Sequence, residues 1–150
     1  MAVPESPRQA ALNLLSRREH CRAELLAKLL ARGHEPDAIG PVLDALEDER
    51  LLSDARYAES YLRVRSSKGY GPQRIRAELR ERGVDTGLIH ESMSEAQNDW
   101  FELARQVREK RFGHALPGDF KERAKQMRFL QYRGFDSAQI HAALETEYQD

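Results

Sequence analysis

A spaced pattern of residues occurs three times along the chain, and it restricts the fold more than any other feature. The pattern is Leu, two variable residues, Arg-Gly, five variable residues, Ile, three variable residues, and then Leu or Met. Its copies begin at Leu29, Leu79 and Leu130, at offsets of 50 and 51 residues. A fixed period of this length indicates tandem repeats of one supersecondary unit. The remaining pattern residues are Arg32, Gly33, Ile39 and Leu43, then Arg82, Gly83, Ile89 and Met93, and finally Arg133, Gly134, Ile140 and Leu144.

Each copy has the features of a helix end, a turn and the start of a second helix. Glycine adopts the left-handed conformation after a helix without a Cβ penalty, and an arginine before it is favourable at the negative end of the helix dipole. Pro36 suits the first turn of the following helix in the first copy. The candidate N-caps of this helix in the other copies are Asp85 or Thr86, and Asp136 or Ser137.

A further helix is expected before each of these helix pairs. Ser6 with Pro7, and Ser53 with Asp54, are signals for an N-cap and a first turn. In the third repeat we expect this helix to begin near Gln97. Its expected apolar face consists of Trp100, Phe101, Ala104 and Val107.

The fold class that follows is all-α, because no segment alternates apolar and polar residues as a strand does. The three expected three-helix repeats span residues 1–52, 53–96 and 97–150. One such unit buries little apolar surface by itself, so neighbouring repeats should pack in tandem and form an elongated, curved molecule. The expected core of the second repeat comprises Ala58, Tyr61, Leu62, Ile75, Leu79, Ile89 and Met93.

The sequence does not indicate a catalytic or metal site. Cys21 is the only cysteine, so it forms no internal disulfide, and without a recognisable partner base it is read as a small residue near a helix start. The histidines lack the spacing of a zinc site, and no phosphate-binding loop is found. The prediction is a protein without enzyme activity and without a cofactor.

Export and membrane insertion are not indicated either. The N-terminal stretch MAVPESPRQAA lacks the basic start and apolar run of a signal peptide. No apolar run approaches the length needed to span a bilayer. A cytoplasmic protein is expected.

Charge is segregated along the chain, although the net charge of −1 argues against a general polyanion binder. Residues 35–54 contain seven acids and one arginine, whereas residues 56–82 contain eight basic residues and three acids. Residues 105–133 contain nine basic residues and three acids. Such blocks are either solvated helix faces or a binding surface on which acidic and basic regions are separated, and both interpretations stay open.

A helix, a glycine turn and a second helix also suggest sequence-specific reading of DNA, but the charges oppose it. The second helix would enter the major groove. In the second repeat the segment 85–93 has no Lys or Arg, and its counterparts in the other repeats are acidic. Placing them among phosphates would cost electrostatic energy.

Two arginines of the second repeat are not explained by helix stability. Arg76 and Arg80 are four residues apart, and a like-charge pair at this spacing costs about 0.2 to 0.5 kcal/mol. These arginines therefore either contact an acidic partner or lie on a face that is open to water. The corresponding residues are Leu26 and Leu30 in the first repeat, and Met127 and Gln131 in the third.

The segment LLSDARYAESYLRVRSSKGYGPQRIRAELRERGV resembles the RecX family of bacterial proteins that regulate the recombinase RecA. The segments DWFELARQ and RFLQYRGFD resemble the third unit of the same family. The resemblance extends from about Pro7 onward and is weakest in the first repeat. It depends on Asp54, Tyr57, Tyr61, Arg63 and Arg65, on KGYGPQRI, and on ELRERG.

The resemblance implies a small, cytoplasmic protein of three three-helix units without enzyme activity. A monomer is expected, although the sequence leaves the oligomeric state open. The implied partner is the RecA filament on single-stranded DNA. Such proteins lodge in the filament groove, hinder growth and strand exchange, and damp ATP hydrolysis and repressor cleavage in the SOS response. Weak direct contact with DNA is also open, as is the rival function of a DNA-binding protein that acts without RecA.

The candidate partner-binding residues form two basic patches. Tyr70 lies between Gly69 and Gly71, where it either stacks on a partner or packs over its own loop. These glycines and Pro72 are expected to shape the turn into the next helix. The first patch is Arg63, Arg65, Lys68, Tyr70, Arg74, Arg76 and Arg80, and the second is Lys110, Arg111, Lys125 and Arg128.

Overall fold

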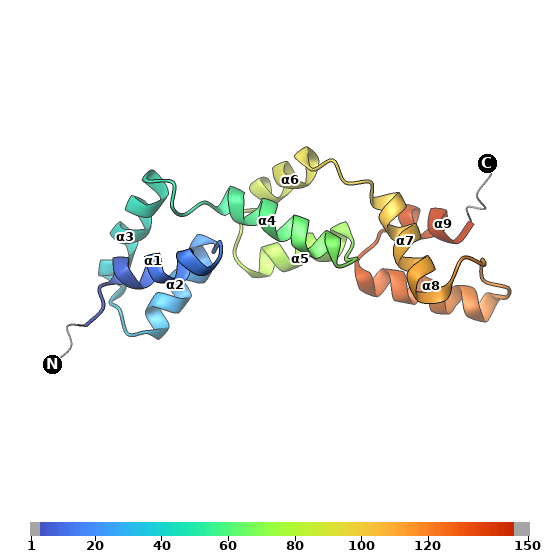
Figure 1. The fold of residues 1–150 in the computed structure, drawn as a ribbon, viewed down its shortest axis with the longest axis horizontal. Helices are drawn as coiled ribbons and strands as arrows, with labels where there is room; N and C mark the ends of the chain where they lie inside the picture. Colours follow the sequence, from blue (N-terminus) through green and yellow to red (C-terminus); the bar gives the residue numbers. More distant parts are fainter. Residues whose placement is uncertain (1–3, 146–150) are drawn as a thin grey trace. The chain divides into compact units, whose positions relative to one another are not determined.

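The computed structural model describes residues 4–145, and all the regular secondary structure in this range is helical (Figure 1). The prediction of an all-α repeat fold is therefore confirmed. Each repeat contributes three helices in chain order. The helices are α1 (Pro7–Arg17), α2 (Arg22–Ala31), α3 (Pro36–Asp48), α4 (Asp54–Ser67), α5 (Pro72–Glu81), α6 (Thr86–Glu95), α7 (Trp100–Phe112), α8 (Phe120–Arg133) and α9 (Ser137–Glu145).

The repeated glycine ends the middle helix of each repeat in the same way. Gly33, Gly83 and Gly134 have φ angles of 88°, 87° and 99°. In each repeat the amide after the glycine donates a hydrogen bond to the carbonyl of the repeated leucine, which closes a left-handed helix cap. These bonds are His34 to Leu29 (3.2 Å), Val84 to Leu79 (3.1 Å) and Phe135 to Leu130 (3.1 Å).

The apolar residues of the pattern form the inner faces of the helices. Every repeated Leu, Ile and Met is buried, and Leu29, Leu79 and Leu130 are fully inaccessible to solvent. In the second repeat, Tyr61 is only half-buried. The other six residues of the expected core there are buried.

Most of the polar residues that were predicted as N-caps do cap the helices that follow them. The Ser6 hydroxyl accepts a hydrogen bond from the Gln9 amide, and the Ser53 hydroxyl accepts one from the Arg56 amide. Asp85 accepts a bond from the Leu88 amide and is the cap of α6. The cap of α9 is Asp136, which accepts a bond from Gln139.

The start of α7 differs from the prediction. The helix begins at Trp100 rather than near Gln97, because the Asp99 carboxylate caps it by accepting a hydrogen bond from the Glu102 amide at 3.0 Å. Phe101 was expected on the buried apolar face of this helix, but about half of its surface is exposed. Ala104 is fully buried, as expected. The apolar face of α7 is thus narrower than the sequence suggests.

The chain divides into two compact units. Unit 1 comprises the residues up to Ser60 together with Leu79–Ser92, and unit 2 comprises Tyr61–Glu78 together with the residues from Met93 onward. The division passes through α4 and α5. The core of unit 1 includes Leu14, Leu25, Leu29, Ile39, Leu43, Leu46 and Leu52, and that of unit 2 includes Ala104, Leu130, Phe135, Ile140, Ala143 and Leu144.

The predicted repeat limits lie between helices. The limit at residues 52 and 53 falls between α3 and α4, and the limit at residues 96 and 97 falls between α6 and α7. The outermost residues of the predicted first and third repeats, 1–3 and 146–150, lie outside the described part of the chain. Among residues 4–145, no helix is long and apolar enough to span a membrane.

Candidate functional site

The N-terminus of α5 packs directly against the turn that follows α8. The Gly71 amide donates a hydrogen bond to the Arg133 carbonyl at 2.7 Å, and the Gln73 amide donates to the Gly134 carbonyl at 2.9 Å. A Cβ atom on Gly71 would lie 2.5 Å from the Gly134 carbonyl carbon, and one on Gly134 would lie 2.3 Å from the Arg74 Cβ. Both glycines are therefore required by this contact, which we call the unit 2 joint.

Unit 1 contains a similar contact between α2 and the turn after α5. The thiol of Cys21, which precedes α2, donates to the Arg82 carbonyl at 3.3 Å. A Cβ atom on Gly83 would lie 2.7 Å from the Ala23 Cβ. We call this contact the unit 1 joint. In both joints the glycine turn of one repeat meets the middle helix of the preceding repeat.

Cys21 is a structural residue of the unit 1 joint. It is fully buried, and this burial raises the pKa of its thiol. A buried, protonated thiol is a poor nucleophile. The start of the adjacent helix is completed by Asp54, whose carboxylate accepts a hydrogen bond from the Arg22 amide at 2.7 Å. Asp54 is one of the residues on which the family resemblance depends, and in the structure it caps a helix of the first repeat.

Tyr70 lies at the centre of an arginine cluster in unit 2. The guanidinium carbons of Arg65, Arg74 and Arg133 lie 3.8, 4.5 and 4.9 Å from the centre of its ring. Since cations contact this half-buried ring, the geometry favours packing over the loop rather than stacking on a partner. The sequence did not single out Arg133, because its place before the repeated glycine was already explained by the helix end.

The same cluster contains its own carboxylate. Glu78 accepts hydrogen bonds from the Tyr61 hydroxyl at 2.6 Å and from Arg65 at 2.9 Å, and Arg74 lies 3.5 Å away. Burial alone would raise the pKa of Glu78, but the hydrogen bonds from Tyr61 and Arg65 outweigh it and lower the pKa. Arg65 and Arg74 are therefore partly neutralised within the fold.

Residues from both predicted patches line one pocket of about 450 Å³ in unit 2. Lys68 comes from the first patch, and Lys110 and Arg111 come from the second. Arg133 adds a fourth cation and donates a hydrogen bond to the Lys68 carbonyl at 3.1 Å. We call this cavity the basic pocket. Its other lining residues are Ser67, Gly69, Leu103, Gln106, Val107 and Phe129.

The remaining predicted residues do not join this pocket. Arg63, Arg80, Lys125 and Arg128 are exposed, and Arg76 is half-buried. Lys125 lies over the Phe112 ring, 6.0 Å from its centre. Among the described residues, the guanidinium groups of Arg63, Arg76, Arg80 and Arg128 make no ion pair with a carboxylate.

Two arginines of the second basic block, Arg108 and Arg105, make their polar contacts within the fold. Arg108 is 1% exposed, and its guanidinium donates to the carbonyls of Gly113, His114 and Ala115. It also donates to the Gln126 side chain at 3.4 Å. Because it fastens the loop between α7 and α8, Arg108 does not contribute to the exposed charge. No pattern in the sequence indicates that this arginine is buried.

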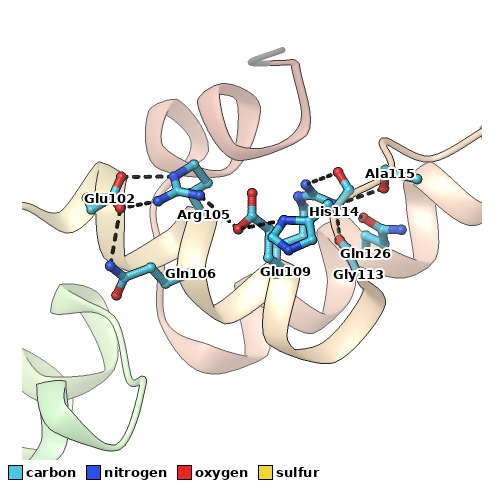
Figure 2. A network of polar contacts seen from close by, with 9 residues as sticks. Glu102, Arg105, Gln106, Glu109, Gly113, His114, Ala115 and Gln126 are labelled. Atoms are coloured by element: carbon cyan, nitrogen blue, oxygen red, sulfur yellow. Dashed lines mark hydrogen bonds and ion pairs between the residues drawn. The ribbon is translucent and has the colours of Figure 1, made fainter. Parts of the chain in front are cut away.

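Arg105 is the second of these internally paired arginines. It forms ion pairs with Glu102 and with Glu109, the latter at 2.8 Å, and these pairs raise its pKa (Figure 2). Burial alone would raise the pKa of Glu109, but its hydrogen bond with Arg105 outweighs it and lowers the pKa. The exposed charge near the end of α7 therefore comes from Lys110 and Arg111.

The family follows from comparison with known proteins. Models of the first, second and third three-helix domains of RecX match residues 8–46, 53–93 and 97–144. The chain belongs to the RecX family. Each match lies within one of the three repeats predicted from the sequence.

Individual RecX proteins are similar over nearly the whole chain. The regulatory protein RecX of Halorhodospira halophila is 49% identical, with 99% of this chain and 92% of the relative covered. That of Pseudomonas entomophila is 48% identical, with 92% and 89% covered. The crystal structure of RecX from Lactobacillus salivarius matches with a TM-score of 0.79 at 26% identity, and covers 93% of this chain and 92% of that one. These names describe regulatory proteins, and a RecX regulatory role follows for this chain.

Proposed function

We propose that this chain binds the RecA filament on single-stranded DNA and inhibits its recombinase, ATPase and coprotease activities during DNA repair and the SOS response. The observation that carries the proposal is the convergence of Lys68, Lys110 and Arg111 in one pocket, which no carboxylate of the described part of the chain lines. Such a surface suits an acidic protein face or a phosphate. Membership of a family of regulatory proteins supports it.

The proposed contact residues are those whose charge is free to face a partner. Exposed cations outside internal ion pairs retain their attraction for an opposite charge, whereas Arg65 and Arg74 share theirs with Glu78. We therefore assign Arg65, Tyr70 and Arg74 to the support of the loop. The proposed contacts are Arg63, Lys68, Arg76, Arg80, Lys110, Arg111, Lys125 and Arg128.

Binding alone accounts for the proposed inhibition. RecA hydrolyses ATP, exchanges strands and promotes repressor cleavage as a filament, so a ligand that occupies the filament and stops its growth reduces all three together. The chain itself then needs no catalytic group. A monomer in the cytoplasm, where the filament forms, suffices for this mechanism.

Strand exchange by RecA, measured with and without the chain, tests this function. We expect exchange and DNA-dependent ATP hydrolysis to fall together as the chain is added to preformed filaments. Bovine serum albumin at the same concentration serves as the protein control. Undiminished strand exchange at saturating amounts of the chain would contradict the proposal.

A further inference from the structure

The basic pocket of unit 2 gathers like charges, of which Arg133 and Arg111 contact the Phe129 ring while the ammonium groups of Lys68 and Lys110 are not used by the described fold. Lys68 follows α4, whereas Lys110 and Arg111 belong to α7 and Arg133 ends α8. Among residues 4–145, no Asp or Glu lines the pocket. Within residues 4–145 the ammonium groups of Lys68 and Lys110 make no hydrogen bond or ion pair. Converging cations repel one another, so their position points to an anionic ligand.

The pocket lining also has an apolar part. Leu103, Val107 and Phe129 contribute apolar side chains, and each is only partly buried. The volume of about 450 Å³ lies within the range of pockets that hold small ligands. A purely ionic ligand would leave this apolar surface in contact with water. The pocket therefore suits a ligand that carries an apolar group among its negative charges.

Single-stranded nucleic acid fits this lining poorly. Proteins bind its bases by stacking them on aromatic rings. Of the described residues, Phe129 alone contributes an aromatic side chain to the lining. The guanidinium carbons of Arg133 and Arg111 lie over its ring at 5.3 and 5.8 Å from the centre. The edge-to-face contact with Phe112 at 5.3 Å further restricts the ring. Carboxylates beside an aliphatic side chain match both the charge and the apolar surface.

We propose that the basic pocket binds a short acidic peptide segment of a partner protein and takes an aliphatic side chain of that segment against Leu103, Val107 and Phe129. Lys68 and Lys110 pair with the carboxylates on either side of that side chain. Arg111 and Arg133 hold Phe129 in place and add positive charge. The inference rests on the proposed function only for the identity of the protein that carries the segment.

Fluorescence anisotropy of a labelled peptide tests the pocket directly. The probe is fluorescein-labelled Asp-Glu-Asp-Leu-Asp-Glu-Asp, titrated with the full chain. The double variant Lys68→Glu with Lys110→Glu should weaken binding by about tenfold or more, since two exposed ion pairs are replaced by repulsion. Both side chains are exposed, so the variant should keep the melting curve of the original chain.

A matched control separates the pocket from net charge. Arg17 and Lys121 are exposed, lie outside the pocket, and make no ion pair within the described residues. Arg17→Glu with Lys121→Glu changes the net charge equally and should alter the affinity by less than about twofold at near-physiological salt, because distant exposed charges are screened. Equal weakening by both double variants would overturn the proposal.

The apolar part of the proposal is tested by changing the probe. Replacing the central leucine of the peptide with glycine should weaken binding by about fivefold or more, because the buried aliphatic group is lost. An unchanged affinity would overturn the assignment of Leu103, Val107 and Phe129. Tighter binding of an oligothymidylate with the same charge, in competition with the peptide, would assign the pocket to nucleic acid instead.

Failure of this inference is distinguishable from failure of the proposed function. If the peptide binds but the chain has no effect on strand exchange, the pocket proposal is retained and the assignment of RecA as partner is overturned. Inhibited strand exchange without peptide binding would overturn the pocket proposal and leave the function intact.

Discussion

Gly134→Ala should destabilise the protein by about 3 kcal/mol or more. The φ angle of 99° costs an alanine about 1 to 2 kcal/mol. The new Cβ would also lie 2.3 Å from the Arg74 Cβ and 2.7 Å from the Arg74 amide nitrogen, so the start of α5 has to move. Overpacking of this kind adds about 1 to 3 kcal/mol. The free energy of unfolding in urea measures the total.

The other repeated glycines provide matched controls for this variant. Gly33 has a φ of 88° but no atom within 4 Å of an added Cβ, so Gly33→Ala should cost only the conformational penalty. The destabilisation by Gly83→Ala should lie between those of Gly33→Ala and Gly134→Ala, because the new Cβ would meet only the Ala23 Cβ at 2.7 Å. Equal costs at all three positions would show that the helix cap alone requires glycine and that the two joints contribute nothing.

The double variant Arg76→Glu with Arg80→Glu should lose most of the inhibition of RecA-driven strand exchange. Both residues lie on α5, where Arg80 is exposed and Arg76 is half-buried. Neither makes an ion pair within residues 4–145, so reversal of their charge breaks no ion pair of the described fold. Surface changes without a packing role alter stability by less than about 0.5 kcal/mol. Helix content and the melting curve should therefore be retained.

The control for this variant is again Arg17→Glu with Lys121→Glu, which should inhibit like the original chain. Inhibition by the original chain should also weaken as salt rises, because exposed charge pairs are screened over about 8 to 10 Å near physiological ionic strength. Full inhibition by the folded Arg76→Glu, Arg80→Glu variant would show that these arginines do not contact the filament. The contact would then be assigned to the basic pocket, Lys125 and Arg128.

The local structure of the repeats was predictable because it depends on short-range rules. The positive φ of Gly83 and the cap at Asp85 follow from the residues that surround them. The start of α7 was predicted wrongly, since Asp99 competes with earlier residues for the N-cap and its carboxylate reaches the Glu102 amide. Boundaries of this kind depend on a single hydrogen bond.

Contacts between distant residues were not predictable from the repeat pattern. The requirement for glycine at position 71 arises from Gly134, and no short-range rule links them. Likewise, the placing of Lys68 beside Lys110 depends on how α4 and α7 pack. Arg108 and Lys110 are two residues apart in one basic block, yet the first is buried and the second is exposed. Charge counts along a sequence do not make that distinction.

Binding of the chain to RecA filaments, compared with bare single-stranded DNA of the same length over a range of salt concentrations, tests the central claim most directly. Non-specific DNA binding has Kd values of about 10⁻⁴ to 10⁻⁶ M at physiological salt. Binding to the filament should be at least about tenfold tighter than binding to bare DNA under those conditions. Equal affinity for both, with the same dependence on salt, would contradict it and identify a DNA-binding protein that acts without RecA.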